Sequence, residues 1–229
     1  MKNCIIFSGQ YRTFGKTKEN IKQFIALNDL DVYCHLWSVD ESEINDIIEN
    51  LQPKKILVED FDCYKPYFES IESSIRFTNP KPSTMDILSN HASMNFGRKQ
   101  ALDLIEEEYD NFIYCRYDID FFNVFKIISL SDVISVPFEE SYNLISDIFC
   151  ISPFKYAKHY FLFDYFQKIH SSDFEEGFLY YLDKIKQYGS ENVRIHREER
   201  YCPHMLLLRN LYNNGVPFNL YNFPVRLYK

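Results

Sequence analysis

The run Asp118-Ile119-Asp120 carries two carboxylates two positions apart, directly after the apolar stretch from Asn111 to Tyr117. That stretch is typical of a buried strand, and side chains alternate along an extended chain, so the two carboxylates are predicted to share one side. Carboxylate oxygens suit Mg²⁺ or Mn²⁺, with the remaining positions left to water and substrate phosphates. We therefore predict a divalent-metal site at Asp118 and Asp120. A turn with two solvated aspartates is the alternative, since a bare D-x-D is common.

Positively charged side chains near this motif could contact an anionic ligand. Arg116 lies inside the predicted strand, two residues before Asp118. A charge in an apolar run needs a partner, which could be an aspartate, a diphosphate or a sugar ring. Arg98 and Lys99 lie on a long helix predicted from Ser83 to about Glu108, where they could face the same ligand or be ordinary surface cations.

The loop from Ser8 to Arg12 follows the first predicted strand, Lys2 to Phe7. Gly9 allows the backbone to approach a ligand closely, and the next helix offers its N-terminus. Arg12 could hold a nucleotide phosphate or base, while a plain strand–helix loop is the alternative. The loop is neither G-x-G-x-x-G nor a Walker A motif, which argues against an NAD-binding protein and a P-loop NTPase.

The elements that must position these residues alternate strand and helix in the first half. The capping-box spacing of Asp40 and Glu43 predicts that a helix begins there. Strand–helix–strand order predicts a parallel sheet with crossover helices, whereas the stretch from Asp60 to Pro82 is predicted to be irregular. The other predicted elements are strands at Asp31 to Trp37 and Lys54 to Val58 and a helix from Thr17 to Leu27.

The second half has a different pattern. Short strands are predicted first, then helices, then an extended C-terminus. We find no linker, and we interpret residues 1–229 as a single α/β domain. The predicted elements are strands at Val133 to Val136 and Leu144 to Ile151, helices at Pro153 to His170, Phe174 to Tyr188 and Pro203 to Tyr212, a helix end at Asn214-Gly215, and the segment Phe218 to Tyr228.

Composition limits the class of protein. The chain of 229 residues is 46% hydrophobic and 25% charged, which is ordinary for a globular domain and excludes a disordered or collagen-like chain. Its formal net charge of -8 lacks the electrostatic footprint of a general nucleic-acid-binding protein. An acidic protein can still hold an anionic ligand if a metal ion or a few placed arginines supply positive charge.

The expected compartment is the cytoplasm. The chain starts without a signal peptide and has no stretch of membrane-spanning length. Its six cysteines form no C-x-x-C pair, so reduced, buried thiols are expected. These features are compatible with peripheral contact with the inner face of the membrane, and they leave the oligomeric state open.

Several motifs together resemble a family. IIFSGQYRTF, HLW, SMNFGRKQALDLI and FIYCRYDIDF occur in this order. They are similar to bacterial and large-virus glycosyltransferases of the GT-A fold, which build capsule, lipopolysaccharide or capsid glycans. The recurring G-Q-x-R, R-x-D and D-x-F motifs are represented by Gly9–Arg12, Arg116–Asp118 and Asp147–Phe149. The resemblance covers about residues 1 to 210.

The resemblance implies a GT-A-like α/β domain with a mixed central sheet flanked by helices. Residues 1–120 would form a Rossmann-like nucleotide-binding half, and residues 121–229 an acceptor half. A nucleotide-diphosphate sugar would be the donor, and a surface-glycan or lipid-linked molecule the acceptor. The residues implied near the nucleotide or donor sugar are Ser8, Gly9, Gln10, Arg12, Arg98, Arg116 and Asp118.

The resemblance also implies roles in chemistry. Asp118 and Asp120 would hold Mn²⁺ or Mg²⁺ against the diphosphate, where the ion offsets the charge of the leaving group. His204, at a helix start, is either a third metal ligand or structural. Asp147, on a predicted strand with apolar neighbours, could act as general base towards an acceptor hydroxyl or hydrogen-bond the donor sugar.

Two other functions are consistent with the sequence. A sugar nucleotidyltransferase would carry a glycine-rich loop with a basic residue after the first strand, and SGQYRTFGK is a loose version of one. A non-catalytic carbohydrate-binding or assembly protein with a degenerate site would tolerate Asp118→Ala and Asp120→Ala.

Overall fold

The computed structural model describes residues 2–37, 40–74, 82–127, 132–139, 144–161 and 203–228. The predicted helix Phe174 to Tyr188, the end of the predicted helix before it, and Cys202 lie outside these ranges. Within them, no helix is long and apolar enough to cross a membrane.

The first half alternates strand and helix as predicted. Asp40 is the N-cap of the second helix, where its Oδ1 accepts a hydrogen bond from the Glu43 backbone N–H at 3.0 Å. This capping contact confirms the predicted helix start. The elements are β1 (Asn3–Gly9), α1 (Phe14–Asn28), β2 (Asp31–Trp37), α2 (Glu41–Leu51) and β3 (Lys55–Glu59).

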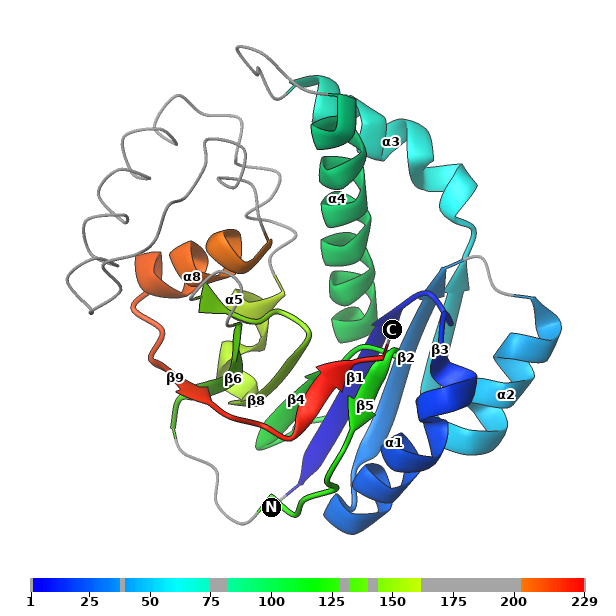
Figure 1. Cartoon of the computed structure of the whole chain (residues 1–229), viewed down its shortest axis with the longest axis vertical. Coiled ribbons are helices and arrows are strands. Elements are labelled where there is room, and N and C mark those ends of the chain that lie inside the picture. Colours follow the sequence, from blue (N-terminus) through cyan, green and yellow to red (C-terminus); the bar gives the residue numbers. More distant parts are fainter. Residues whose placement is uncertain are drawn as a thin grey trace.

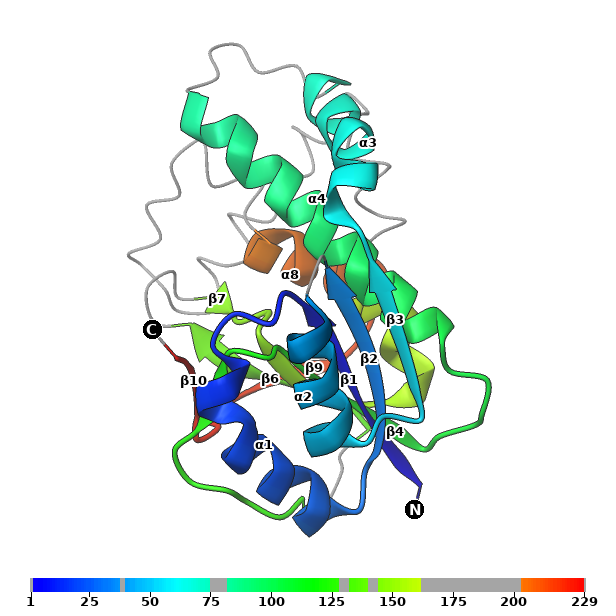
Figure 2. The same ribbon diagram turned by 90° about the vertical axis from the view of Figure 1, so that its right-hand side faces the viewer.

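The central sheet is mixed. The first three strands and β4 (Asn111–Cys115) are parallel, and β8 (Phe149–Pro153) runs antiparallel to β4. In the described residues the strand order is β3-β2-β1-β4-β8-β6-β7, where β6 is Ile134–Glu139 and β7 is Leu144–Ile145, and β9 (Phe218–Tyr221) lies beside β6. Helices cover both faces (Figures 1 and 2), which confirms the predicted α/β fold with a mixed central sheet.

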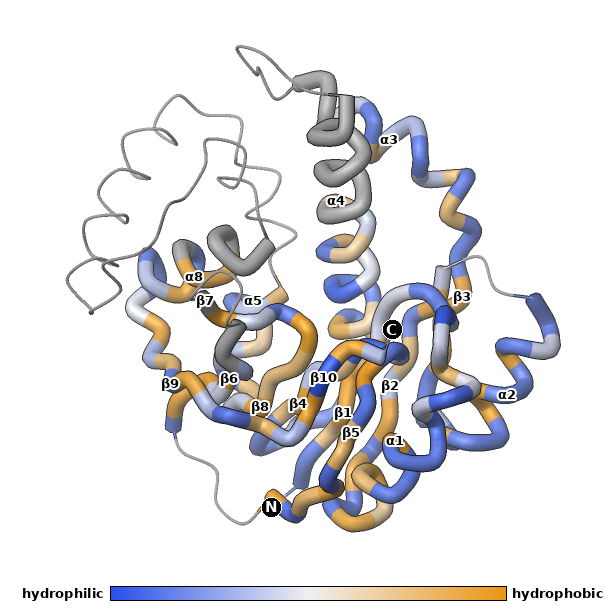
Figure 3. The backbone as a smooth tube through the Cα atoms, viewed as in Figure 1, coloured by the Kyte–Doolittle hydropathy of each residue, from blue (hydrophilic) through white to orange (hydrophobic). Residues whose placement is uncertain are grey.

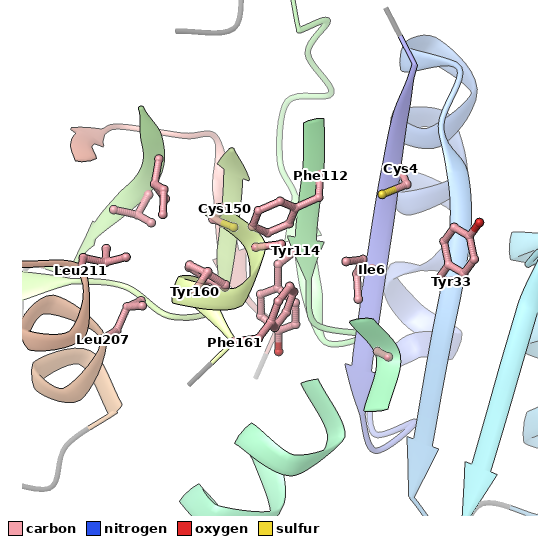
Figure 4. Packing of buried hydrophobic residues seen from close by; sticks show 14 of the residues in the cluster. Cys4, Ile6, Tyr33, Phe112, Tyr114, Cys150, Tyr160, Phe161, Leu207 and Leu211 are labelled. Atoms are coloured by element: carbon pink, nitrogen blue, oxygen red, sulfur yellow. The ribbon is translucent and has the colours of Figure 1, made fainter. Parts of the chain in front are cut away.

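Alternate residues of β1 serve two cores, one on each face of the sheet. Ile5 and Phe7 pack with side chains of α1 and α2. Cys4 and Ile6 pack on the other face with α4 (Pro82–Asp103), α5 (Ala157–Tyr160) and α8 (Pro203–Asn213), as the close-up in Figure 4 shows. Figure 3 shows the resulting pattern of apolar strands and mixed helices. This double burial explains why the predicted strands read as continuous apolar runs.

One prediction in the first half is wrong. The stretch predicted to be irregular contains a helix, α3 (Phe61–Ser74), with Pro66 inside it. Phe61, Tyr64 and Phe68 follow helical spacing, and their rings lie 5.6 to 5.9 Å from Trp37. This aromatic packing outweighs the one backbone hydrogen bond that the proline cannot donate.

Two further boundaries differ from prediction. Helix α4 ends at Asp103 because a turn at Ile105 returns the chain to β4, whose first residue pairs with Asn3. The predicted strand Leu144 to Ile151 is two strands, β7 (Leu144–Ile145) and β8, with a break at residues 146–148. Asp147 therefore lies between strands rather than on one.

The C-terminal elements agree with prediction. Helix α8 ends at Asn213, and Gly215 follows with φ +61°, a conformation that favours glycine at a helix end. The last residues are extended, and β10 (Val225–Leu227) pairs antiparallel with β5 (Ile119–Phe121). Figure 1 shows this last strand, in red, beside β5.

Candidate functional site

Most of the predicted site residues gather at one edge of the central sheet. Strands β1 and β4 are parallel, so their C-terminal ends lie at the same side of the sheet. We call this side, where the parallel strands end, the carboxyl edge. Strand β8 begins there, since Phe149 pairs with Cys115 at the end of β4. The Gly9–Arg12 loop, the Arg116–Asp118 segment and Asp147 therefore meet at the position where ligands bind in open α/β sheets.

The loop after β1 exposes backbone and one arginine. Ser8 is buried and Gln10 is exposed, while Gly9 between them has φ +131°, which side chains of L-residues rarely adopt. Arg12 has φ +45° in a turn closed by the Phe14 N–H donating to the Tyr11 carbonyl. This left-handed residue brings its guanidinium Nη1 to 3.6 Å from Asp118 Oδ2.

The segment after β4 is a turn, not a continuous strand. Tyr117 is buried, with its ring 5.3 Å from Phe7 and 5.9 Å from Phe14. Its carbonyl accepts a hydrogen bond from Thr17 Oγ1 at 2.8 Å. The chain turns here, so Asp118 and Asp120 do not continue β4, and their carboxylates contact different partners. That the two side chains share one side stays a prediction.

Asp118 forms a two-point ion pair with Arg116. Arg116 Nε donates to Oδ1 at 2.9 Å, and Nη2 donates to Oδ2 at 2.6 Å. Burial lowers the Arg116 pKa, but the bond to Asp118 and the charge of Asp147 raise it by more, so the group stays charged. The sequence left open whether Arg116 pairs with an aspartate or contacts a ligand. The structure contains the ion pair with Asp118.

Asp120 is held from two directions. Asn20 on α1 donates to its Oδ1 at 2.9 Å. Arg226 lies opposite Asp120 in the β5–β10 pair, and its Nε and Nη2 donate to Oδ2 at 3.1 and 3.0 Å. Tyr228, the residue directly after β10, donates its backbone N–H to the Asp118 carbonyl at 2.8 Å. The C-terminal strand thus covers the D-x-D motif.

In this arrangement protein donors occupy the oxygens of both carboxylates. All four carboxylate oxygens of Asp118 and Asp120 accept hydrogen bonds from arginine or asparagine nitrogens. An ion would have to take oxygens that guanidinium groups now hold. Among the described residues, no three His, Cys, Asp or Glu side chains gather in a way that could hold a metal. The predicted third ligand, His204, has a side chain outside the described part, so the Mn²⁺ or Mg²⁺ site stays a prediction.

Asp147 belongs to a second, buried ion pair. Arg98 Nη2 donates to Asp147 Oδ2 at 3.0 Å and to the Asp147 carbonyl at 2.6 Å, and Tyr160 donates to the same carbonyl at 3.3 Å. The Arg98 guanidinium lies 4.5 Å from the centre of the Tyr114 ring. Burial lowers the Arg98 pKa, but Tyr114 and Asp147 raise it by more. This geometry favours a positioning role for Asp147 over a free general base.

The two cations of α4 divide between interior and surface. Arg98 is fully buried at the carboxyl edge, whereas Lys99 pairs with Asp103 one turn later on the same helix. The surface interpretation therefore holds for Lys99. Sequence reasoning missed Asn20 and Arg226 as partners of Asp120. Their separation from it, 100 and 106 residues, leaves no local pattern that could have found them.

No protein-family model matches the chain, and no curated protein matches its sequence. Among solved structures it is similar to mouse xyloside xylosyltransferase 1 in its apo form, at 8% identity and a TM-score of 0.40, over 96% of this chain and 84% of that one. It is similar to glycosyltransferase GlyE of Streptococcus pneumoniae TIGR4, at 13% identity and a TM-score of 0.41, over 96% of this chain and 45% of that one.

A third similar structure is galactosyltransferase LgtC in complex with donor and acceptor sugar analogs. Its identity is 12% and its TM-score 0.39, over 94% of this chain and 72% of that one. A likeness at these identities and TM-scores assigns no activity to this chain.

Proposed function

We propose that this chain transfers a sugar from a nucleotide-diphosphate sugar to a hydroxyl of a surface-glycan or lipid-linked acceptor. The observation that carries the proposal is the meeting of the Gly9–Arg12 loop and the Arg116–Asp118 turn at the carboxyl edge. The φ of Gly9 leaves backbone open to close approach by a ligand, and the arginines offer planar donors that suit phosphate. The order of the motifs along the chain supports the same reaction.

The reaction needs two changes at the sugar. The bond between the anomeric carbon and the phosphate oxygen breaks, and its electron pair leaves with the nucleoside diphosphate. The acceptor oxygen forms a new bond to the anomeric carbon, and its proton passes to a base or to water. The residues of this chain would hold the diphosphate in place and offset its charge. Asp147, fixed by Arg98, would keep the start of β8 beside the donor sugar.

A thermal-shift screen of UDP, GDP, CDP and TDP tests the proposal, with Mn²⁺ and separately with EDTA. A ligand that binds only the folded chain raises the melting temperature by mass action. We expect one nucleoside diphosphate to raise it, and Arg12→Gln to reduce the rise. Lys155→Gln is the matched control, because Lys155 pairs with Asp132 near the start of β4, at the opposite edge of the sheet.

Turnover then distinguishes the reactions. The nucleotide sugar that matches the bound base should release its nucleoside diphosphate when acceptor is added. Release of pyrophosphate from a nucleoside triphosphate and a sugar phosphate would instead identify a nucleotidyltransferase. No shift with any nucleotide under either condition would contradict the proposal and would favour a carbohydrate-binding module, for which a glycan array is the next measurement.

A further inference from the structure

At the D-x-D motif the positively charged side chains outnumber the carboxylates that they contact, although the chain as a whole has a net charge of -8. Three guanidinium groups, those of Arg12, Arg116 and Arg226, contact the two carboxylates of Asp118 and Asp120. The neighbouring pair of Arg98 and Asp147 is neutral overall and adds nothing to this excess. Among the described residues, three guanidinium charges here face two carboxylate charges, and a local excess of positive charge is suited to bind an anion.

We propose that Arg12, Arg116 and Arg226 themselves compensate the charge of the donor's diphosphate, and that Asp118 and Asp120 hold these arginines in place instead of holding a divalent ion. The inference rests on the proposed function, because it concerns the same donor. It differs from the D-x-D prediction in what the carboxylates bind. It also adds Arg226, a residue of the last strand, to the site.

The exposure of the arginines matches this role. The Arg226 and Arg12 side chains are 66% and 53% exposed, whereas the Asp118 and Asp120 side chains that they contact are 8% and 12% exposed. The carboxylates are therefore in the layer beneath, and the outer guanidinium groups keep N–H donors that face solvent. A guanidinium is always charged and presents several donors in one plane, which suits two-point binding of phosphate oxygens.

The fold fixes both outer arginines. The β5–β10 pair sets Arg226 directly opposite Asp120, and the hydrogen bond from the Tyr228 N–H to the Asp118 carbonyl secures the end of this strand. Arg12 is held by its turn in the left-handed conformation, which L-residues with a side chain adopt only at a cost in free energy. Strain of this kind is concentrated at ligand sites, where the surrounding structure maintains it.

The experiment is a calorimetric titration of the unchanged full chain and four variants with UDP, GDP, CDP and TDP, in EDTA and in Mn²⁺. In EDTA, Arg226→Gln and Arg12→Gln should each weaken binding about tenfold, the size of one charge-assisted hydrogen bond. Asp120→Asn keeps an amide oxygen that can accept from Arg226, so its binding should weaken less than that of Arg226→Gln and should persist in EDTA. Lys155→Gln, which loses a charge at the opposite edge, should bind normally.

A metal held by the D-x-D motif makes the opposite prediction for Asp120→Asn. Binding that requires Mn²⁺ and disappears in Asp120→Asn would overturn the inference while leaving the proposed function intact. Binding by none of the four nucleotides under either condition would remove the proposed function and this inference together. Melting temperatures of all variants show whether a loss of binding is a loss of fold, and Arg226→Lys is a milder replacement if Arg226→Gln does not fold.

Discussion

Two arginine–aspartate contacts at the carboxyl edge have the same chemistry but different surroundings. The Arg98–Asp147 pair has side chains that are 1% and 5% exposed, and Arg98 lies against the Tyr114 ring. The Arg226–Asp120 pair lies at the surface, where the Arg226 side chain is 66% exposed. The first arginine can donate only to the protein, whereas the second can change partner without unfolding anything.

This difference separates a structural ion pair from an exchangeable one. Breaking a buried pair leaves a desolvated charge without compensation, while an exposed pair contributes little because water replaces the partner. The buried pair joins α4 to the start of β8 and so sets the shape of the edge. The exposed arginines of the D-x-D region can then accept a ligand on that fixed support.

The largest expected effect comes from breaking the buried pair. Arg98→Met leaves Asp147 buried without its cation, and we expect the free energy of unfolding to fall by about 3–5 kcal/mol in urea denaturation. Lys99→Met, on the same helix but with a side chain 37% exposed, should lose less than about 1 kcal/mol. The double variant Arg98→Met/Asp147→Leu should recover part of the loss. Equal losses for the two single variants would contradict the comparison.

A smaller effect is expected at Gly97, which lets α4 lie close to β2 and so brings Arg98 to Asp147. A Cβ at this position would lie 2.8 Å from His35 Cε1 and Nδ1 and 3.1 Å from Trp37 Nε1. Gly97→Ala should lower the free energy of unfolding by about 1–3 kcal/mol, because both neighbours are packed rings. Gly15→Ala is the matched control, since its Cβ would meet only the Tyr11 side chain. A Gly97→Ala chain as stable as the Gly15→Ala chain would show that α4 can move away.

The pH dependence of stability tests the contribution of His35, a buried residue of β2. Burial lowers the pKa of His35 below 6.5, and the hydrogen bond to Glu59 only partly offsets it. Below pH 6.5 the unfolded chain takes up a proton that the folded chain resists, so this stabilising contribution is present above pH 6.5 and is lost as the pH falls towards the folded pKa. The slope is at most about 1.4 kcal/mol per pH unit for one group.

Urea denaturation of the unchanged chain and His35→Gln between pH 7.5 and pH 5 measures this effect. The His35→Gln profile should be flatter in the acidic part of the range. Identical slopes for the two chains would mean that His35 does not contribute.

The smallest effect on stability is expected at Arg226. Arg226→Gln removes an exposed guanidinium, while Asn20 still donates to Asp120 and the new amide can do so too, so the free energy of unfolding should change by less than about 1 kcal/mol in urea denaturation. A loss of the size expected for Arg98→Met would instead make Arg226 a structural residue, and the contrast between the two pairs would disappear.

The order of elements was predictable where local pattern dominates. Apolar runs predicted the parallel strands, and the spacing of Asp40 and Glu43 predicted the start of α2. Helix α3 was missed because its stability comes from aromatic rings that pack on Trp37, a contact between distant segments, while Pro66 and the prolines that follow the helix indicated a loop. Pattern alone does not weigh tertiary packing against local propensity.

The sequence predicted which residues lie at the candidate site but not which of them form ion pairs with one another. The loop after β1 and the segment after β4 were both expected at one edge, since parallel strands end together. The turn at Tyr117, which sends Asp118 and Asp120 to different partners, depends on the packing of that ring against Phe7. The partners Arg98 of Asp147 and Arg226 of Asp120 are separated from them by 49 and 106 residues, so only the fold reveals them.

The most direct test of the central claim is a crystal structure of the full chain with the nucleoside diphosphate that gives the largest thermal shift. The account predicts the diphosphate at the carboxyl edge, beside the Gly9 backbone, with phosphate oxygens on Arg12 and Arg226 and with the Arg98–Asp147 pair unchanged. A diphosphate bound away from this edge, with the D-x-D ion pairs undisturbed, would contradict it.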